Sequence, residues 1–311
     1  MTMTAWRSSV STLQLNPLAP TTKSFRRKLY RHLLLAMAAF TFFASAIHSF
    51  AEEMAVADSP KPETIRVGVL SSAREPGENT SQGLFISILR KAGMKARAVS
   101  AEEVKNGVLE ELDIFIIGGG SGTAFNASLG PDGGQLVMEF VKKGGGVLAS
   151  CAGGYSFVRG HNEALKYIEI ANARCIDTAG GRWARGKGVV EIIPEESDAP
   201  TRKMFYANGP LWEITDAPGF GRIAALARFK TDIKQEGDEG GIMPGTPAIL
   251  GGSYFDGRFV LFSAHPEFHR ELGSNSLIVD AAYWVTSGPL SPDDKIDWNS
   301  IFPSQAPEPM P

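Results

Sequence analysis

The feature that most constrains the fold is an alternation of short apolar runs with longer segments of helical periodicity. Residues 64–70, 113–120 and 146–150 are the apolar runs, and residues 81–94 and 133–146 carry helix-like patterns between them. Strands that are apolar throughout and alternate with helices are typical of a parallel sheet covered on both faces. The sequence therefore predicts an α/β fold, a three-layer sandwich with a mainly parallel, flavodoxin-like sheet.

The second half of the chain changes to strand-like runs and ends in an amphipathic segment at 274–288, which predicts a closing helix. A hairpin is expected with Asp256 and Gly257 at its turn, because Asp-Gly is a favoured hairpin turn. Residues 290–311 hold five prolines and few apolar residues, which predicts a loosely attached, proline-rich tail. The folded domain is therefore expected to cover residues 64–289.

The first 51 residues have the composition of a targeting segment, with six basic residues, no acidic residue and an apolar run at 33–47. That run has the length of a signal-peptide core and is shorter than the roughly 20 residues of a membrane span. Small residues at Ser49 and Ala51 predict cleavage after Ala51, with an uncleaved anchor as the alternative. We therefore expect residues 1–51 to be an export signal and 52–63 a linker, in a periplasmic or secreted protein without a stable membrane span.

The charge of the expected mature chain bears on its partners. Removing the six basic residues of the signal from the 31 in the chain leaves 25, against 34 acidic residues. The remaining basic residues are scattered, whereas nucleic-acid phosphates are bound by clustered ones. Nucleic acid is therefore not an expected partner, and the sequence carries no signal for an oligomeric state.

Cys151 follows the apolar run 146–150 and precedes Ala152 and two glycines. Small neighbours allow a sharp strand-to-helix turn that exposes a nucleophile at its apex. At such a turn the amide of Ala152, together with those of Gly119 and Gly120 in the loop after residue 117, could stabilise an oxyanion. Two other interpretations stay open, a buried structural cysteine and a disulfide with Cys175, the second cysteine of the chain.

A thiol nucleophile normally has a base, and the expected mature chain holds three histidines, His161, His265 and His269. His265 ends a strand-like run and is followed by Pro266 and Glu267. In an extended segment residues i and i+2 face the same side, so Glu267 could orient the His265 ring toward Cys151. The pattern thus favours Cys151, His265 and Glu267 as a catalytic set.

These motifs resemble the class I glutamine amidotransferase-like superfamily, in which a strand-end Cys and a His-Pro-Glu motif form the triad. With the segments "IFIIGGGSG" and "FYANGPLW", they are most similar to the biotin-protein ligase N-terminal (BPL-N) domain. The resemblance covers residues 65–283 and implies Cys151 as nucleophile, His265 as base and Glu267 as its partner. The "ANGP" turn, with Asn208, is expected to border the substrate pocket.

Departures from the superfamily pattern limit what carries over. Glutamine-hydrolysing members have Gly two residues before the cysteine and Gln shortly after it, where this chain has Ala149 and then Gly154-Tyr155-Ser156. Glutamine is therefore not the expected substrate, and biotin ligase activity is not expected either. We expect a cysteine hydrolase acting on an amide or related acyl bond of a small-molecule or peptide-like substrate, with no cofactor and no metal. The alternatives are a non-catalytic binding or scaffold domain and redox chemistry at Cys151.

Overall fold

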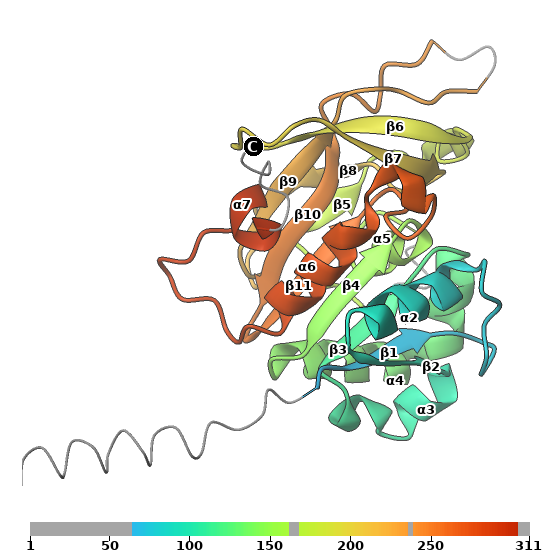
Figure 1. The fold of residues 1–311 in the computed structure, drawn as a ribbon, viewed down its shortest axis with the longest axis vertical. Coiled ribbons are helices and arrows are strands. Elements are labelled where there is room, and N and C mark those ends of the chain that lie inside the picture. Colours follow the sequence, from blue (N-terminus) through green and yellow to red (C-terminus); the bar gives the residue numbers. More distant parts are fainter. Residues whose placement is uncertain (1–63, 162–167, 236–238, 304–311) are drawn as a thin grey trace, which may run out of the picture. The chain divides into compact units, whose positions relative to one another are not determined.

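A computed structural model describes residues 64–161, 168–235 and 239–303 of the chain. The expected signal and linker, residues 1–63, lie outside the described residues, as do residues 304–311. The described chain forms a nine-stranded sheet in the order β2-β1-β3-β4-β11-β10-β9-β6-β7 and a second sheet of β5 and β8 (Figure 1).

Five neighbouring strands of the large sheet are parallel. They are β2 (Lys95–Val99), β1 (Arg66–Leu70), β3 (Ile114–Ile117), β4 (Gly146–Ser150) and β11 (Gly257–Phe262). Every residue of β3, β4 and β11 is buried, as expected for strands covered on both faces. The order 2-1-3-4 followed by a fifth parallel strand is that of a flavodoxin-like sheet, which confirms the predicted fold class.

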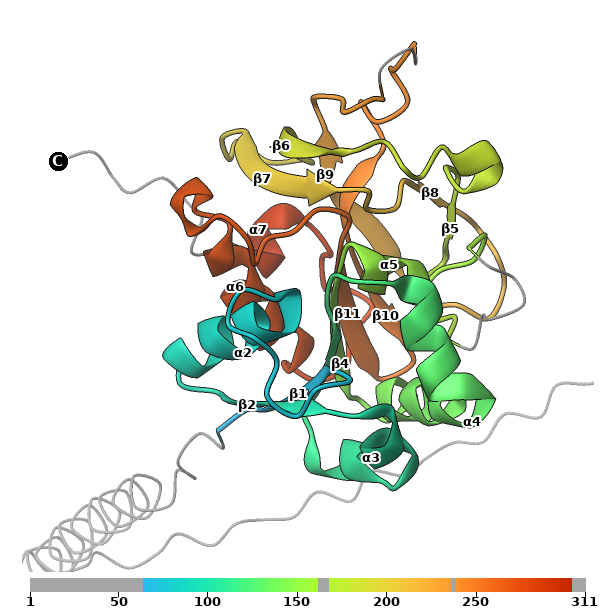
Figure 2. The same ribbon diagram turned by 90° about the vertical axis from the view of Figure 1, so that its right-hand side faces the viewer.

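Helices cover both faces of the parallel strands (Figure 2). On one face α2 (Ser81–Lys91) packs beside α6 (Asn275–Val285), the predicted closing helix. On the other face lie α3 (Ala101–Lys105), α4 (Gly122–Lys142) and α5 (Ala152–Ser156). The chain kinks within α4 at Gly130, whose φ of 62° is left-handed. The sandwich therefore has three layers, with the sheet in the middle.

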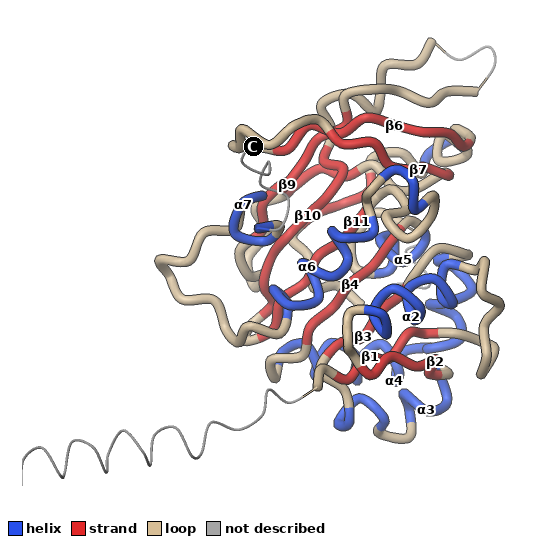
Figure 3. Tube along the Cα trace, in the orientation of Figure 1, coloured by secondary structure: helices blue, strands red, loops and turns tan. Residues whose placement is uncertain are grey.

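The remaining four strands extend the sheet in antiparallel fashion (Figure 3). They are β10 (Pro247–Tyr254), β9 (Ile223–Phe229), β6 (Lys187–Pro194) and β7 (Arg202–Ala207). The hairpin between β10 and β11 pairs Tyr254 with Gly257, so its two turn residues are Phe255 and Asp256. The predicted turn was therefore one residue too late, because Gly257 belongs to the strand. The small second sheet pairs β5 (Ala173–Cys175) with β8 (Trp212–Ile214).

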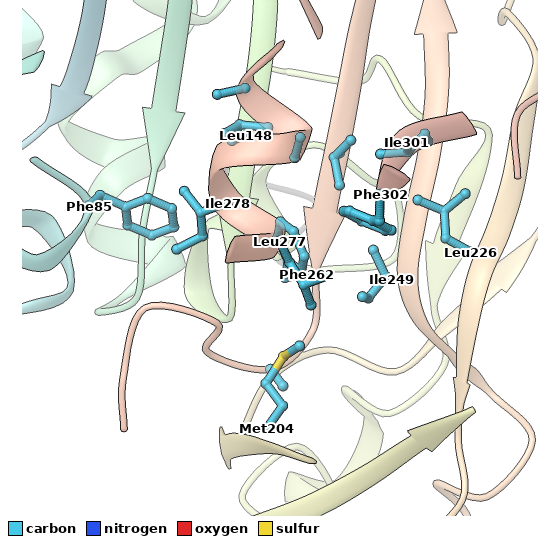
Figure 4. Packing of buried hydrophobic residues seen from close by; sticks show 14 of the residues in the cluster. Phe85, Leu148, Met204, Leu226, Ile249, Phe262, Leu277, Ile278, Ile301 and Phe302 are labelled. Carbon is cyan, nitrogen blue, oxygen red and sulfur yellow. The ribbon is translucent and has the colours of Figure 1, made fainter. Parts of the chain in front are cut away.

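The structure differs from the prediction of a loose tail from residue 290. A short helix, α7 (Trp298–Ile301), begins after a capping box at Asp297 and buries Trp298, Ile301 and Phe302 almost completely. Figure 4 shows Ile301 and Phe302 beside Ile249 and Phe262 in the core. The prolines had suggested a tail, but the burial of these three large apolar side chains holds the segment against the core. The folded unit therefore runs through residue 303.

Two hydrophobic clusters fill the two spaces between sheet and helices. One lies under α2, α6 and α7, with Phe85, Ile278 and Phe262 among its members, and the other lies under α3 and α4. The parallel register of β4 with β3 and β11 places the carboxyl ends of these three strands next to one another. Among the described helices, none is long and apolar enough to span a membrane.

Candidate active site

Cys151 stands at the junction of β4 and α5, as the sequence predicts. Its backbone has φ 47° and ψ −111°, a strained combination for a residue with a side chain, and its amide donates to Phe262 O at 2.9 Å. A Cβ on Gly153 would lie 1.8 Å from Ile117 O, and one on Gly154 would lie 2.8 Å from the Trp212 ring. The sharp turn therefore requires these two glycines.

His265 follows β11, the strand next to β4, and lies opposite Cys151. Its backbone amide donates to Phe205 O at 2.7 Å, which ties the turn after β11 to strand β7. Nδ1 of His265 lies 2.8 Å from Oε1 of Glu267, and the side chains of the two residues are 6% and 0% exposed. Because Nδ1 donates to the carboxylate, Nε2 is left to exchange a proton with the thiol.

The electrostatics of the pair favour a charged imidazole. Burial alone lowers the pKa of His265, but the negative charge of Glu267 and the hydrogen bond with Cys151 outweigh it and raise the pKa to about 10. His265 is therefore protonated at neutral pH in the presence of Glu267. An imidazolium beside a thiol favours the thiolate form of that thiol.

The thiol of Cys151 has a second neighbour that works in the opposite direction. Its Sγ lies 3.2 Å from Ala207 O at the end of β7 and can donate a hydrogen bond to it. A carbonyl oxygen accepts from a neutral thiol but repels a thiolate. The proton shared by Cys151 and His265 thus has two places, on sulfur, where it can be donated to Ala207 O, or on Nε2 of His265, which leaves a thiolate.

Two serines that the sequence did not single out complete the surroundings of Glu267. Ser81 is the first residue of α2, and its hydroxyl donates to Glu267 Oε1 at 2.6 Å. Ser150 is the last residue of β4, and its hydroxyl donates to the same oxygen at 2.9 Å. Both serines are buried. With the Nδ1–H of His265, three donors therefore converge on one carboxylate oxygen.

Gly119 plays a different part from the one predicted. Its amide donates to Ser81 Oγ at 2.7 Å, so this N–H is not available to an oxyanion. A Cβ at Gly119 would lie 2.5 Å from Cε1 of His265, so the missing side chain makes room for the imidazole ring. The amides of Gly120 and Ala152 have no hydrogen-bond partner within the described residues, so these two remain the candidate oxyanion donors.

Asn208 lies beside the site, but its side chain serves the turn. Its φ is 56°, and its Oδ1 accepts from the amide of Gly186 at 2.6 Å, while its backbone oxygen accepts from the Tyr155 hydroxyl at 3.3 Å. The contact with Cys151 is made one residue earlier, by the carbonyl of Ala207. The structure therefore gives Asn208 a role in shaping the turn and no visible role in holding an oxyanion.

A buried polar network around Arg185 anchors the turn that contains Asn208. Arg185 forms a salt bridge with Asp177 at 2.8 Å between side chains that are 3% and 1% exposed, and it also donates to Gly209 O at 2.6 Å and to the Tyr206 hydroxyl. The Tyr155 hydroxyl lies 3.3 Å from Asp177 Oδ2. Burial, with Asp177 nearby, raises the pKa of Tyr155. Nothing in the sequence pattern pointed to this ion pair, because its partners lie in an irregular loop.

The second cysteine takes no part in this arrangement. Cys151 and Cys175 are both free, so the disulfide interpretation does not apply to this structure. Burial, and to a lesser extent the charge of Asp177, raises the pKa of Cys175 well above its ordinary value. Cys175 is thus a buried, unreactive thiol, and Cys151 is the candidate nucleophile.

The other two histidines lie apart from the pair. The rings of His161 and Tyr155 are tilted against each other with their centroids 4.3 Å apart, and burial lowers the pKa of His161, which Asp177 partly offsets. His269 is exposed and lies 2.9 Å from Glu271. The described residues include no cluster of three or more His, Cys, Asp or Glu side chains that could hold a metal ion.

Two open grooves of about 590 and 390 Å³ flank β8. Their walls come from residues such as Arg174, Glu213 and Ile214, and none of the predicted site residues lines either groove. We place the candidate site at Cys151 and not in these two grooves, because volume alone supplies no reactive group. The grooves carry mixed charge and no buried nucleophile.

Comparisons with known proteins add little to this geometry. No protein-family profile and no curated protein matches the chain. Among solved structures, a β-galactosidase from Bacillus circulans sp. alkalophilus is 12% identical with a TM-score of 0.40, over 65% of this chain and 28% of that one. A ThuA-like protein from Bacteroides uniformis ATCC 8492 is 12% identical with a TM-score of 0.46, over 74% and 94%. A cytoplasmic protein from Salmonella typhimurium is 12% identical with a TM-score of 0.43, over 73% and 100%.

These likenesses are too distant to assign an activity. The chain spans less than a third of the β-galactosidases that it resembles, between 28% and 31% of their length. The fold assignment therefore rests on the strand order and the helix layers, and the chemistry rests on the residues of the site.

Proposed function

We propose that this protein is an exported amidotransferase-like domain that hydrolyses an amide or related acyl bond with Cys151 as nucleophile. The observation that carries the proposal is the meeting of a strained, positive-φ cysteine with a buried His265–Glu267 pair at the carboxyl ends of adjacent strands. Ligands of open α/β sheets bind at this edge. We expect the substrate to be a small molecule or a peptide-like chain that presents an amide or related acyl carbonyl to Cys151.

The reaction balances with the groups at hand. The Cys151 thiolate attacks the carbonyl carbon, forming a C–S bond, and the carbonyl oxygen becomes an oxyanion near the amides of Gly120 and Ala152. The His265 imidazolium then gives its Nε2 proton to the leaving nitrogen as the C–N bond breaks. Water, deprotonated by the now neutral His265, adds to the thioester, and the C–S bond breaks to release a carboxylic acid and restore the thiolate–imidazolium pair.

Export and family membership belong to the same proposal. The basic front, the apolar run and the small residues before Ala51 support cleavage of residues 1–51 and release to the periplasm or outside the cell. The motifs around Cys151 and His265, with "FYANGPLW", support a relation to the BPL-N domain without biotin ligation. Mass spectrometry of protein recovered from the expressing cells tests cleavage, since a chain that keeps residues 1–51 contradicts it.

The pH dependence of iodoacetamide labelling, located by mass spectrometry, tests the nucleophile. We expect Cys151 to be labelled rapidly below the ordinary cysteine pKa of about 8.5, and His265→Ala to slow that labelling. Cys175 is a built-in control, because burial keeps it a thiol and it should stay unlabelled in the folded protein. Slow labelling of Cys151 until high pH, unchanged by His265→Ala, contradicts the hydrolase.

A second function is favoured by one contact. The Ala207 carbonyl 3.2 Å from Sγ stabilises a neutral thiol, which suits a non-catalytic binding or scaffold domain that keeps the pocket of an amidotransferase-like fold. The same labelling experiment separates the two functions. A Cys151 that reacts only above pH 8.5, in a protein whose fold is intact, supports the binding domain.

A further inference from the structure

Ser81 makes two hydrogen bonds, and both leave its own helix. Its hydroxyl donates to Glu267 Oε1 at 2.6 Å and accepts from the amide of Gly119 at 2.7 Å. The partners lie 186 and 38 residues away in the chain. One side chain therefore connects the acid of the proposed triad with the glycine loop on the other side of the site.

The helix itself does not need this hydroxyl. The N-cap of α2 is Thr80, whose side chain accepts from the amide of Gly83 at 3.1 Å. Ser81 comes next, is 5% exposed, and its single hydroxyl proton is fully used by Glu267. An alanine would be the better helix former at this position. The serine is thus explained by its contacts across the site.

Gln82, the residue after Ser81 in α2, holds the same loop through the backbone carbonyl of Gly119. Gln82 Nε2 donates to Gly119 O at 2.9 Å, so the first turn of α2 binds both the N–H and the C=O of one residue. With Gly119 fixed in this way, the next amide, that of Gly120, has no partner in the described structure. The imidazole of His265 lies directly against the Gly119 backbone.

We propose that Ser81 is a positioning residue that sets the Glu267 carboxylate and the glycine loop in one fixed arrangement around His265. This inference rests on the proposed function. Ser81 touches no reacting atom, and it acts by holding Oε1 of Glu267 toward Nδ1 of His265 while it holds Gly119 against the ring. Ser150 shares only the first of these tasks, because its hydroxyl contacts Glu267 and not the loop.

The test compares Ser81→Ala with Ser150→Ala and with Ser87→Ala, a matched change on the same helix at a partly exposed residue. Two quantities are measured in each folded variant, the NMR titration of the His265 ring and the hydrogen exchange of the Gly119 amide. We expect Ser81→Ala to lower the His265 titration midpoint by about half a pH unit or more, since a carboxylate held less firmly stabilises the imidazolium less. It should also speed exchange at Gly119 at least tenfold, because that amide loses its acceptor.

The control variants define the contrast. Ser150→Ala should move the His265 midpoint and leave Gly119 exchange unchanged, and Ser87→Ala should change neither. If Ser81→Ala folds poorly, Ser81→Cys fills the same space with a weaker hydrogen-bonding group and is measured in its place. A His265 midpoint and a Gly119 exchange rate equal to those of the wild type overturn the inference.

Failure of this inference and failure of the proposed function are distinguishable. If Cys151 of the wild type is labelled only at high pH, the hydrolase is refuted, whatever Ser81 does. If wild-type Cys151 is labelled rapidly at low pH and Ser81→Ala matches it in midpoint and exchange, only the role of Ser81 is refuted.

Discussion

The most decisive single substitution is Glu267→Gln, which removes a charge and keeps the shape. The glutamine has the same length as glutamate, and its amide oxygen can still accept from Ser81, Ser150 and His265, all of which lie within 2.9 Å of Oε1. The change therefore isolates the negative charge beside His265. In the wild type that charge opposes the effect of burial on the imidazole.

The size of the effect follows from the raised pKa. At about 10, the pKa of His265 lies about 3.5 pH units above the ordinary 6.5, and at about 1.4 kcal/mol per unit this is about 5 kcal/mol in favour of the charged ring. A neighbouring opposite charge typically accounts for about 1–3 units. We therefore expect Glu267→Gln to lower the pKa of His265 by about 2 units or more, which is about 3 kcal/mol.

The assay is an NMR titration of the histidine side chains in the wild type and the variant, with Cys151 labelling measured in parallel. Glu271→Gln is a matched control, because Glu271 contacts His269 at 2.9 Å with the same two-residue spacing but is 71% exposed. It should leave the His265 titration unchanged. A His265 pKa that is the same in Glu267→Gln and in the wild type would refute the electrostatic argument.

Four further outcomes test the fold around the site. Gly153→Ala should cost about 3 kcal/mol in urea unfolding and slow Cys151 labelling, because its Cβ would lie 1.8 Å from a backbone oxygen of β3. Arg185→Leu should destabilise by about 3–5 kcal/mol, since it leaves the Asp177 carboxylate buried and unpaired. Trp298→Ala should cost about 3–5 kcal/mol, whereas a loose tail predicts almost no change. The pKa of His265 is higher in the folded protein than in the unfolded chain, so the charged ring stabilises the fold fully below about pH 6.5, and this contribution is lost toward pH 10. The free energy of unfolding of the wild type should therefore fall over that window relative to that of His265→Gln.

The parallel core and the two ends of the site could be predicted because their signals are local. Strand β4 is buried throughout and is followed directly by Cys151 and small residues, and β11 ends at Phe262, three residues before His265, with Glu267 two residues after that histidine. Parallel neighbouring strands bring such carboxyl ends together, but the periodicity placed only Cys151 at this edge, and His265 was paired with it by the need of a thiol for a base and by the resemblance of the two motifs. The fold class followed from the same alternation.

What could not be predicted depends on contacts between distant residues. Ser81 looks in the sequence like the first residue of a helix, and its contact with Glu267 spans 186 residues. Gly119 was predicted as an oxyanion donor from its place in a loop, but its amide is used by that serine. Proline content near the C-terminus concealed the apolar anchor at Trp298. In each case the outcome depended on which tertiary partner was present, and no local pattern encodes that.

The backbone of Cys151 offers an argument for function that is independent of any resemblance. Five described residues other than glycine have positive φ, and four of them, Glu196, Asn208, Phe255 and His269, are exposed or half-buried. Cys151 is 6% exposed, and its ψ of −111° lies far from the left-handed helical region that tolerates side chains. Such a conformation costs of order 1–3 kcal/mol and persists only where the surroundings impose it. Here the bond to Phe262 O and the close contact at Gly153 impose it, and its effect is to hold a thiol at the edge of the sheet beside His265.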